Sequence, residues 1–195
     1  MQHEASGSGY TAGRLIFLVG PSGSGKDSLI DAARAHLGMA GVEVARRVIT
    51  RSAEAKGEAA VGVSPERFEA MRKNGEFAMY WRANGLAYGI PVQINEWLAA
   101  GRHVLVNGSR GYLSEARQRY PGMIAIQLQV APQVLRQRLL ARGREDAHAI
   151  EQRLERNTAF KADYNVHVLD NSASLEAAVV ALIDLLEQEH VLGGV

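Results

Sequence analysis

Residues 15–28 read LIFLVGPSGSGKDS, and the architecture of the chain can be inferred outward from them. The first five residues form a short apolar run, which is typical of a strand buried on both faces of a parallel sheet. The next segment matches the pattern G-x-x-x-x-G-K, and apolar residues at helical spacing follow it. In that pattern, glycines let backbone N–H groups surround a phosphate, and the start of a helix adds partial positive charge. We therefore predict a strand, a phosphate-binding loop at 20–28 and a helix at 25–37.

Apolar strands continue to alternate with amphipathic helices along the rest of the chain. This alternation predicts a parallel sheet flanked by helices with right-handed crossovers, an α/β fold of the P-loop NTPase class. Residues 52–62 have no clear period and are interpreted as a flexible insertion, and residues 77–88 form an aromatic stretch. The further predicted strands are 42–50, 103–106, 123–130 and 166–169, and the further predicted helices are 65–74, 92–100, 109–119, 132–141, 147–160 and 175–188.

The composition of the whole chain limits its partners and its location. At 195 residues it suits one domain, and 22 Lys and Arg against 21 Asp and Glu leave no overall field for nucleic acid or an anionic membrane. Cysteine is absent, which excludes disulfides and thiolate metal sites and fits a reducing cytoplasm. The first nine residues lack a signal-peptide pattern, and the longest apolar runs are too short to span a bilayer. We expect a cytoplasmic protein without nucleic-acid or membrane partners, and its oligomeric state stays open, with a homodimer as one option.

The phosphate-binding loop departs from its usual pattern at one position. Lys26 is expected to neutralise the transferred phosphoryl group, but the next residue, normally a serine or threonine that ligates Mg²⁺, is Asp27. The acidic residue that usually ends a core strand and positions Mg²⁺ is also missing, because the strand HVLVN ends in Asn107. We hypothesise that Asp27 supplies this carboxylate, directly or through water; the alternative is that Asp27 only stabilises the helix dipole. The expected ATP-binding residues of the loop are Gly20, Pro21, Ser22, Gly23, Ser24, Gly25, Lys26, Asp27 and Ser28.

Several segments of the chain occur in the order found in the guanylate kinase family. They are GPSGSGKDS at 20–28, ITR at 49–51, the block 68–89 and RLLARGRE at 138–145, and the chain resembles that family from residue 14 to residue 187. The resemblance implies a P-loop core, a small acceptor-binding subdomain and a helical lid, with ATP as the donor and Mg²⁺ as the cofactor. The implied division is a disordered N-terminus at 1–12 and a single kinase domain at 13–195, with its core at 13–46, 92–132 and 160–190, the subdomain at 47–91 and the lid at 138–157.

The positions that contact guanine in that family are changed in this sequence. Met79 and Ile90 stand in place of a glutamate and a hydroxyl residue, Asn107 in place of an acidic strand end, and Arg47 in place of a serine. A site that loses such polar partners rejects its ligand steeply, so we expect an acceptor other than guanylate. Because a planar guanidinium binds phosphate oxygens in pairs, the cationic residues that remain suit an acceptor with phosphates at more than one place. The expected acceptor-binding residues are Arg47, Arg51, Tyr80, Tyr88, Asn107, Ser109 and Arg110.

One branch of the family matches closely. GPSGSGKDSL, ITR, WxANGLAYG at 81–89 and VLVNGSR at 104–110 resemble the ribose 1,5-bisphosphate phosphokinases. These enzymes use ATP to convert a small phosphosugar, ribose 1,5-bisphosphate, into 5-phospho-α-D-ribose 1-diphosphate during phosphonate breakdown. The resemblance implies an adenine contact for Asn171, where the alternative is a turn, and catalytic roles for Lys26 and for the lid residues Arg138, Arg142 and Arg153, where the alternative is a basic surface helix.

Two other functions stay open. The first is a guanylate or other nucleoside monophosphate kinase, which shares the donor site and differs in the acceptor. The second is a non-catalytic guanylate kinase-like module that only binds other proteins. The intact glycines of the loop and Lys26 favour a working enzyme over such a module.

Overall fold

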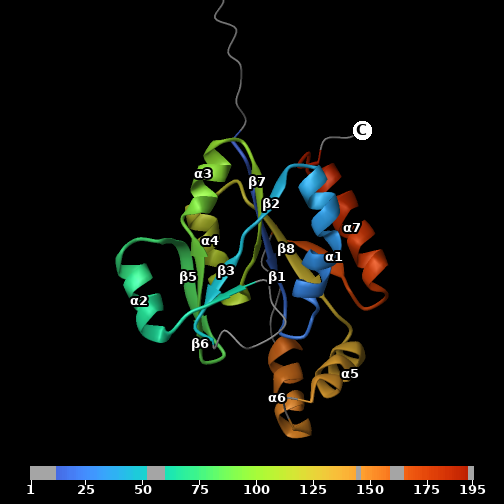
Figure 1. The fold of residues 1–195 in the computed structure, drawn as a ribbon. Helices are drawn as coiled ribbons and strands as arrows, with labels where there is room; N and C mark the ends of the chain where they lie inside the picture. Colours follow the sequence, from blue (N-terminus) through green and yellow to red (C-terminus); the bar gives the residue numbers. More distant parts are fainter. Residues whose placement is uncertain (1–11, 52–59, 144–145, 159–164, 193–195) are drawn as a thin grey trace, which may run out of the picture.

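A five-stranded sheet forms the centre of the molecule in the computed structural model, which describes residues 12–51, 60–143, 146–158 and 165–192 (Figure 1). The strand order is β2-β7-β1-β8-β9, and every pairing in it is parallel. The predicted α/β architecture is therefore confirmed. The strands are β1 (Leu15–Val19), β2 (Val42–Val44), β7 (His103–Asn107), β8 (Ile124–Gln129) and β9 (His167–Asp170).

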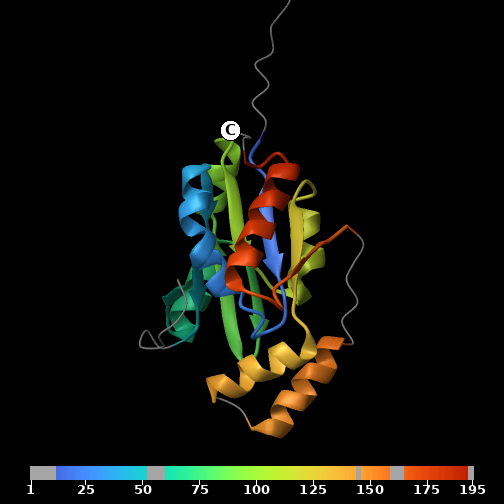
Figure 2. The same ribbon diagram turned by 90° about the vertical axis from the view of Figure 1, so that its right-hand side faces the viewer.

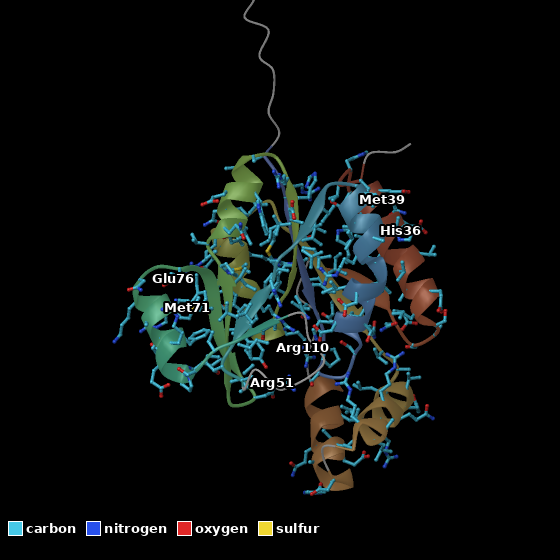
Figure 3. All side chains as sticks on the ribbon, viewed as in Figure 1. His36, Met39, Arg51, Met71, Glu76 and Arg110 are labelled. Atoms are coloured by element: carbon cyan, nitrogen blue, oxygen red, sulfur yellow. The ribbon has the colours of Figure 1, made fainter. Side chains whose placement is uncertain are left out.

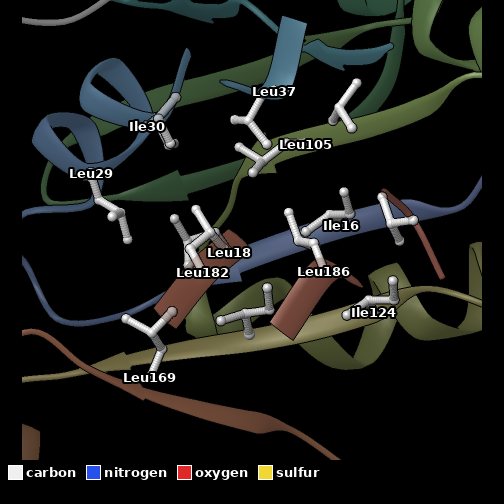
Figure 4. Close-up of a cluster of buried hydrophobic side chains, with 14 of the residues drawn as sticks. Ile16, Leu18, Leu29, Ile30, Leu37, Leu105, Ile124, Leu169, Leu182 and Leu186 are labelled. Carbon is white, nitrogen blue, oxygen red and sulfur yellow. The ribbon is translucent and has the colours of Figure 1, made fainter. Parts of the chain in front are cut away.

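The central strand β1 is apolar at every position because it packs against two cores. Leu15, Phe17 and Val19 face helices α3 (Gln93–Ala99) and α4 (Leu113–Arg119). The two residues between them, Ile16 and Leu18, face the opposite core, which Figure 4 shows between the sheet and helices α1 (Lys26–Met39) and α7 (Leu175–Gln188). Figure 1 shows the sheet between these two helix layers, and Figure 2 looks onto the face that α1 and α7 cover. Alternate residues of a strand point to opposite faces, so a strand covered on both sides has no polar face.

A second sheet of four strands lies outside the central sheet. Its order is β4-β3-β6-β5, and helix α2 (Pro65–Lys73) packs on it through Phe68. The prediction of one strand over 42–50 is wrong: β2 pairs with β7, whereas the next strand pairs with β6 in the other sheet. The predicted insertion ends in a short strand. The strands are β3 (Arg47–Ile49), β4 (Ala60–Gly62), β5 (Phe77–Ala83) and β6 (Leu86–Pro91).

The aromatic stretch is a β-hairpin. Its turn residues, Asn84 and Gly85, have φ values of 51° and 76°, and this left-handed pair is what a two-residue hairpin turn requires. Trp81 pairs with Tyr88 across the hairpin. The turn therefore places two large aromatic residues side by side next to the phosphate-binding loop.

Two further helices, α5 (Pro132–Arg142) and α6 (Ala147–Thr158), lie beyond the end of the central sheet (Figures 1 and 2). They pack on each other around Leu135, Leu139 and Ile150, in a small apolar cluster of their own. The predicted helix 109–119 begins instead as a 3₁₀ turn, η1 (Arg110–Tyr112), and continues as α4. Across the described segments, no helix combines the length and apolarity needed to cross a membrane.

Candidate active site

A cleft of about 470 Å³ opens between the phosphate-binding loop and the second sheet. Strands β1 and β7 are parallel neighbours, so their carboxyl ends meet at one edge of the sheet, which is where ligands bind in open α/β folds. The β5–β6 hairpin and the segment after β7 form the other side. The cleft is lined by Gly20, Ser22, Gly23, Gly25, Lys26, Asp27, Ser28, Arg47, Trp81, Ala83, Asn84, Tyr88, Gly108, Ser109, Arg110, Gly111 and Arg142.

The loop has the geometry of a phosphate cradle. Gly23 and Gly25 have φ values of 93° and 87°, a backbone region that side chains disfavour. A β-carbon at Gly25 would lie only 2.7 Å from the side-chain nitrogen of Asn171. The ammonium group of Lys26 donates to the carbonyl oxygens of Gly20 and Pro21, at 2.9 and 3.3 Å, and so folds over the loop. Helix α1 begins at this point, and its first N–H groups favour an anion.

The underside of the loop is held by residues from distant segments. The side-chain amide of Asn171 donates to the carbonyl oxygen of Ser24 at 2.7 Å, and Arg138 reaches the same oxygen at 3.4 Å. Asn171 is 3% exposed. The family resemblance implies an adenine contact for Asn171, and in the structure its side chain bonds the loop backbone. The adenine contact stays a prediction.

Asp27 joins three elements at the edge of the cleft. Its Oδ1 atom accepts one hydrogen bond from the Arg47 guanidinium at 3.0 Å and another from the Asn107 side-chain amide at 2.7 Å. The Arg47 side chain is 10% exposed and that of Asp27 is 38% exposed. Among the described residues, both side-chain bonds of Asp27 fall on Oδ1, so Oδ2 is the oxygen available to a cation. Carboxylate and hydroxyl oxygens suit Mg²⁺, and Asp27 and Ser28 supply both at the loop.

The half of the cleft opposite the phosphate-binding loop combines aromatic rings with arginines. The rings of Trp81 and Tyr88 stack in parallel with centroids 5.7 Å apart, and the Arg47 guanidinium lies 5.7 Å from the Tyr88 ring centroid. Burial lowers the pKa of Arg110 below its ordinary value, but an arginine in a protein stays protonated. The cleft therefore holds fixed positive charge that is partly shielded from water, which strengthens its attraction for anions.

The structure brings together most of the site residues expected from the sequence, but some expected residues lie elsewhere. Tyr80 is 41% exposed and lies under the Arg72 guanidinium, because alternation along β5 turns it away from the cleft and turns Trp81 toward it. In the view of Figure 3, Arg51 and Arg110 lie between the second sheet and the helices α5 and α6. Arg153 is on α6, and its side chain falls outside the described part of the structure. The expected residues that are described but do not line this cleft are Pro21, Ser24, Arg51, Tyr80, Asn107, Arg138 and Asn171.

Trp81 and Asn84 line the cleft but are not among the site residues predicted from the sequence. The signal that could have identified them is the Asn-Gly pair at 84–85 between residues of alternating polarity, which predicts a hairpin and fixes which side chains share a face.

Two of the positions at which the family resemblance implies a guanine contact are packed inside the protein. Met79 and Ile90 are opposite each other on β5 and β6, and both are fully buried in the apolar core next to α3 and α4. Neither can offer a hydrogen bond to a base. The structure is therefore consistent with an acceptor that is not recognised by hydrogen bonds to a purine base.

Comparison with known proteins gives the family. The guanylate kinase family profile matches residues 12–189. The chain is 60% identical over 173 residues to ribose 1,5-bisphosphate phosphokinase PhnN of Pseudomonas paraeruginosa, covering 88% of this chain and 94% of that protein. It is 59% identical over 177 residues to the protein of the same name from Azotobacter vinelandii, covering 90% and 97%.

A solved structure supports the same fold. The crystal structure of guanylate kinase from Anaplasma phagocytophilum superposes with a TM-score of 0.67 and 18% sequence identity, over 92% of this chain and 87% of that one. At that identity the likeness concerns the fold alone. With the family profile and the close relatives taken together, the chain belongs to the guanylate kinase family of P-loop kinases and, within it, to the PhnN group.

Proposed function

We propose that the chain transfers the terminal phosphoryl group of ATP to ribose 1,5-bisphosphate, giving ADP and 5-phospho-α-D-ribose 1-diphosphate in phosphonate catabolism. The observation that carries this proposal is one cleft that has an intact phosphate loop on one side and, on the other, the buried Arg47 and the partly buried Arg110. The name of the relatives supports the same acceptor. We place the reaction in the cytoplasm, since a chain without cysteine fits that compartment.

The donor side would act by positioning and by neutralising charge. Phosphoryl transfer needs in-line placement of the reacting groups and stabilisation of negative charge, with little covalent chemistry from the protein. The loop N–H groups and Lys26 would hold the β- and γ-phosphates of ATP. Asp27, through Oδ2, and the Ser28 hydroxyl are the residues that would hold Mg²⁺ or its water. When bound, Mg²⁺ supplies further neutralisation of the donor phosphates.

The acceptor side would bind the sugar by its phosphates. Arg47 and Arg110 carry the charge, and the Tyr88 and Ser109 hydroxyl groups can donate hydrogen bonds. Of the described residues that line the cleft, Asp27 alone has a carboxylate, and that carboxylate is already bonded to Arg47 and Asn107. This supports an acceptor that needs no general base. A phosphate oxygen is such an acceptor, because it is already anionic.

The helices α5 and α6 would form the lid. Arg142 lines the cleft and Arg138 reaches the loop carbonyl of Ser24 from the same face of α5. With Arg153 on α6, these side chains would stabilise charge on the transferred group when the lid closes. Excluding water at that moment strengthens every such interaction.

The test is a substrate panel. The enzyme is offered ATP and Mg²⁺ with ribose 1,5-bisphosphate, GMP or AMP, and the product is identified by phosphorus NMR. We expect the diphosphate of the sugar and little conversion of either nucleotide. Phosphorylation of GMP or AMP in preference to the sugar would indicate a nucleoside monophosphate kinase, and no turnover of ATP with any acceptor would indicate a binding module.

A loop variant ties the product to this site. Lys26→Ala is expected to lower kcat by about 100- to 1,000-fold, the usual cost of removing one group that stabilises transition-state charge. Lys73→Ala, at the exposed end of α2, is the matched control and should keep the wild-type rate. Equal rates in the two variants would assign the chemistry to another site.

A further inference from the structure

Asp27 is the point at which the donor loop touches the acceptor subdomain. It lies in the first turn of α1, next to Lys26. Its partner Arg47 begins β3 in the second sheet, and its other partner Asn107 ends β7 in the central sheet. One carboxylate oxygen therefore links the two halves of the cleft.

The guanidinium of Arg47 pairs with this carboxylate. The Arg47 side chain is 10% exposed, and a charge held away from water requires a partner of opposite sign. The carboxylate is itself held in place, because Asn107 donates to the same oxygen and is 4% exposed. The ring of Tyr88 supports the guanidinium face. Asp27 and Tyr88 contact Arg47 directly and Asn107 holds Asp27, which gives the guanidinium a defined orientation in the cleft.

We propose that Asp27 is a positioning residue for the acceptor: its Oδ1 atom holds the Arg47 guanidinium where it receives a phosphate of the acceptor. A guanidinium has five N–H donors in a rigid fork, so one edge can bond Asp27 while others face the cleft. The identity of the acceptor rests on the proposed function. Ribose 1,5-bisphosphate and the nucleoside monophosphates of the alternative function all carry a phosphate, so the positioning role applies to either kind of acceptor.

The proposal separates this role of Asp27 from its role toward Mg²⁺. A residue that acts only through the metal has no effect on acceptor binding when metal and nucleotide are both absent. A residue that positions Arg47 affects acceptor binding under those same conditions. The donor loop thereby contributes to the affinity of the other substrate.

The experiment is calorimetric titration of ribose 1,5-bisphosphate into the enzyme with EDTA and without nucleotide. Asp27→Asn keeps the shape and removes the charge, and we expect the acceptor Kd to rise at least tenfold. Asp31→Asn is the matched control, one turn further along α1, where the carboxylate is exposed and pairs with Arg34 of the same helix. It should bind the acceptor as the wild type does. Should Asp27→Asn fail to fold, Asp27→Ser replaces it, because serine is an ordinary residue at this place in the loop motif.

A double-mutant cycle distinguishes positioning from a general loss of structure. Arg47→Ala should weaken the acceptor at least as much as Asp27→Asn. On the Arg47→Ala background, Asp27→Asn should raise the acceptor Kd by less than a further twofold, because the effects of two residues that act through one contact are not additive. Additive effects, or wild-type acceptor affinity in Asp27→Asn, would overturn the proposal even if its Tm falls.

The same titrations distinguish a failure of the positioning role from a failure of the proposed function. If the wild type does not bind ribose 1,5-bisphosphate, the proposed function fails, and the same variants are titrated with GMP and with inorganic pyrophosphate. Loss of affinity in Asp27→Asn for whichever of these ligands binds would still support the positioning role. If none of these ligands binds, or if Asp27→Asn leaves the affinity unchanged, the positioning role fails as well.

Discussion

The side-chain amide of Asn107 donates a hydrogen bond of 2.7 Å to Oδ1 of Asp27. In P-loop enzymes the strand end usually carries the acid and the helix start carries a hydroxyl. Here the carboxylate stands at the helix start and a neutral amide at the strand end. The two positions therefore hold one negative charge between them, next to the positive charge of Arg47.

This relationship predicts that the two positions behave as a pair. Asn107→Asp would place two carboxylates within hydrogen-bond distance, and like charges so close repel. We expect a loss of about 1–3 kcal/mol in the free energy of unfolding, as for a buried group left without its partner. The exchanged variant Asp27→Asn with Asn107→Asp restores one donor and one acceptor and should recover most of that loss in urea denaturation. An exchanged variant no more stable than Asn107→Asp alone would contradict the pairing.

A purine-reading residue cannot simply be restored at the acceptor site. Met79 is fully buried in the apolar core, so Met79→Glu should lower the free energy of unfolding by about 2–5 kcal/mol without producing guanylate kinase activity. The neighbouring change Tyr80→Glu is the control, because that side chain is exposed and should shift stability by no more than about 0.5 kcal/mol. Thermal and urea unfolding measure both. A stable Met79→Glu variant that phosphorylates GMP would mean that this position is still open to the cleft.

The arginines of the proposed lid should affect the rate rather than the fold. Arg142→Ala and Arg138→Ala are expected to lower kcat by about 10- to 1,000-fold, because each removes positive charge near the transferred group. Arg136→Ala is the matched control on the same helix, where the side chain is exposed and pairs with Glu151 of α6. It should keep kcat and change stability by no more than about 1 kcal/mol. Steady-state kinetics with both substrates separates these outcomes, and an Arg136→Ala variant as slow as the other two would assign the effect to lid packing.

His103 should make stability depend on pH at the opposite end of β7 from the cleft. Burial, with a smaller contribution from the Arg14 charge, lowers the pKa of His103 below its ordinary value near 6.5. Its Nδ1 atom accepts a hydrogen bond from the Arg14 backbone N–H at 3.0 Å, so the neutral ring is the form that fits.

The direction of the pH effect follows from proton binding. The unfolded chain takes up the His103 proton at a higher pH than the native chain does, so stability is complete above about pH 6.5 and declines as the pH falls below it. His103→Gln should lose stability less steeply than the wild type between pH 7 and pH 5. Thermal unfolding across that range measures the slope, and equal slopes would rule His103 out as its source.

The elements predicted correctly are those that depend on residues close together in the chain. The run LIFLV, the glycine pattern and the spacing of Leu29, Ala33 and Leu37 each specify local geometry, and the structure has the strand, loop and helix that they indicate. The single strand predicted over 42–50 failed because its halves pair with different partners, Val44 with Leu105 and Val48 with Gly89. The apolar character of a segment does not identify the strand with which it pairs.

The same distinction applies to the candidate site. The Asn-Gly pair at 84–85 indicates a hairpin, and the alternation of side chains along its first strand then predicts that Trp81 faces the cleft and Tyr80 faces away from it. The position of Asn171 beneath the loop could not be predicted, since it requires knowing that the residue after β9 lies next to Ser24.

By itself, the sequence determined that a phosphate-binding loop joins a buried strand to a helix and that the polar groups for reading guanine are absent. Both conclusions depend on which residues stand at short, fixed spacings. Only the tertiary structure decided that Asp27 holds Arg47, 20 residues away, and Asn107, 80 residues away. A hydrogen bond requires its two atoms within about 3 Å, and separation along the chain does not fix that distance until the two sheets pack.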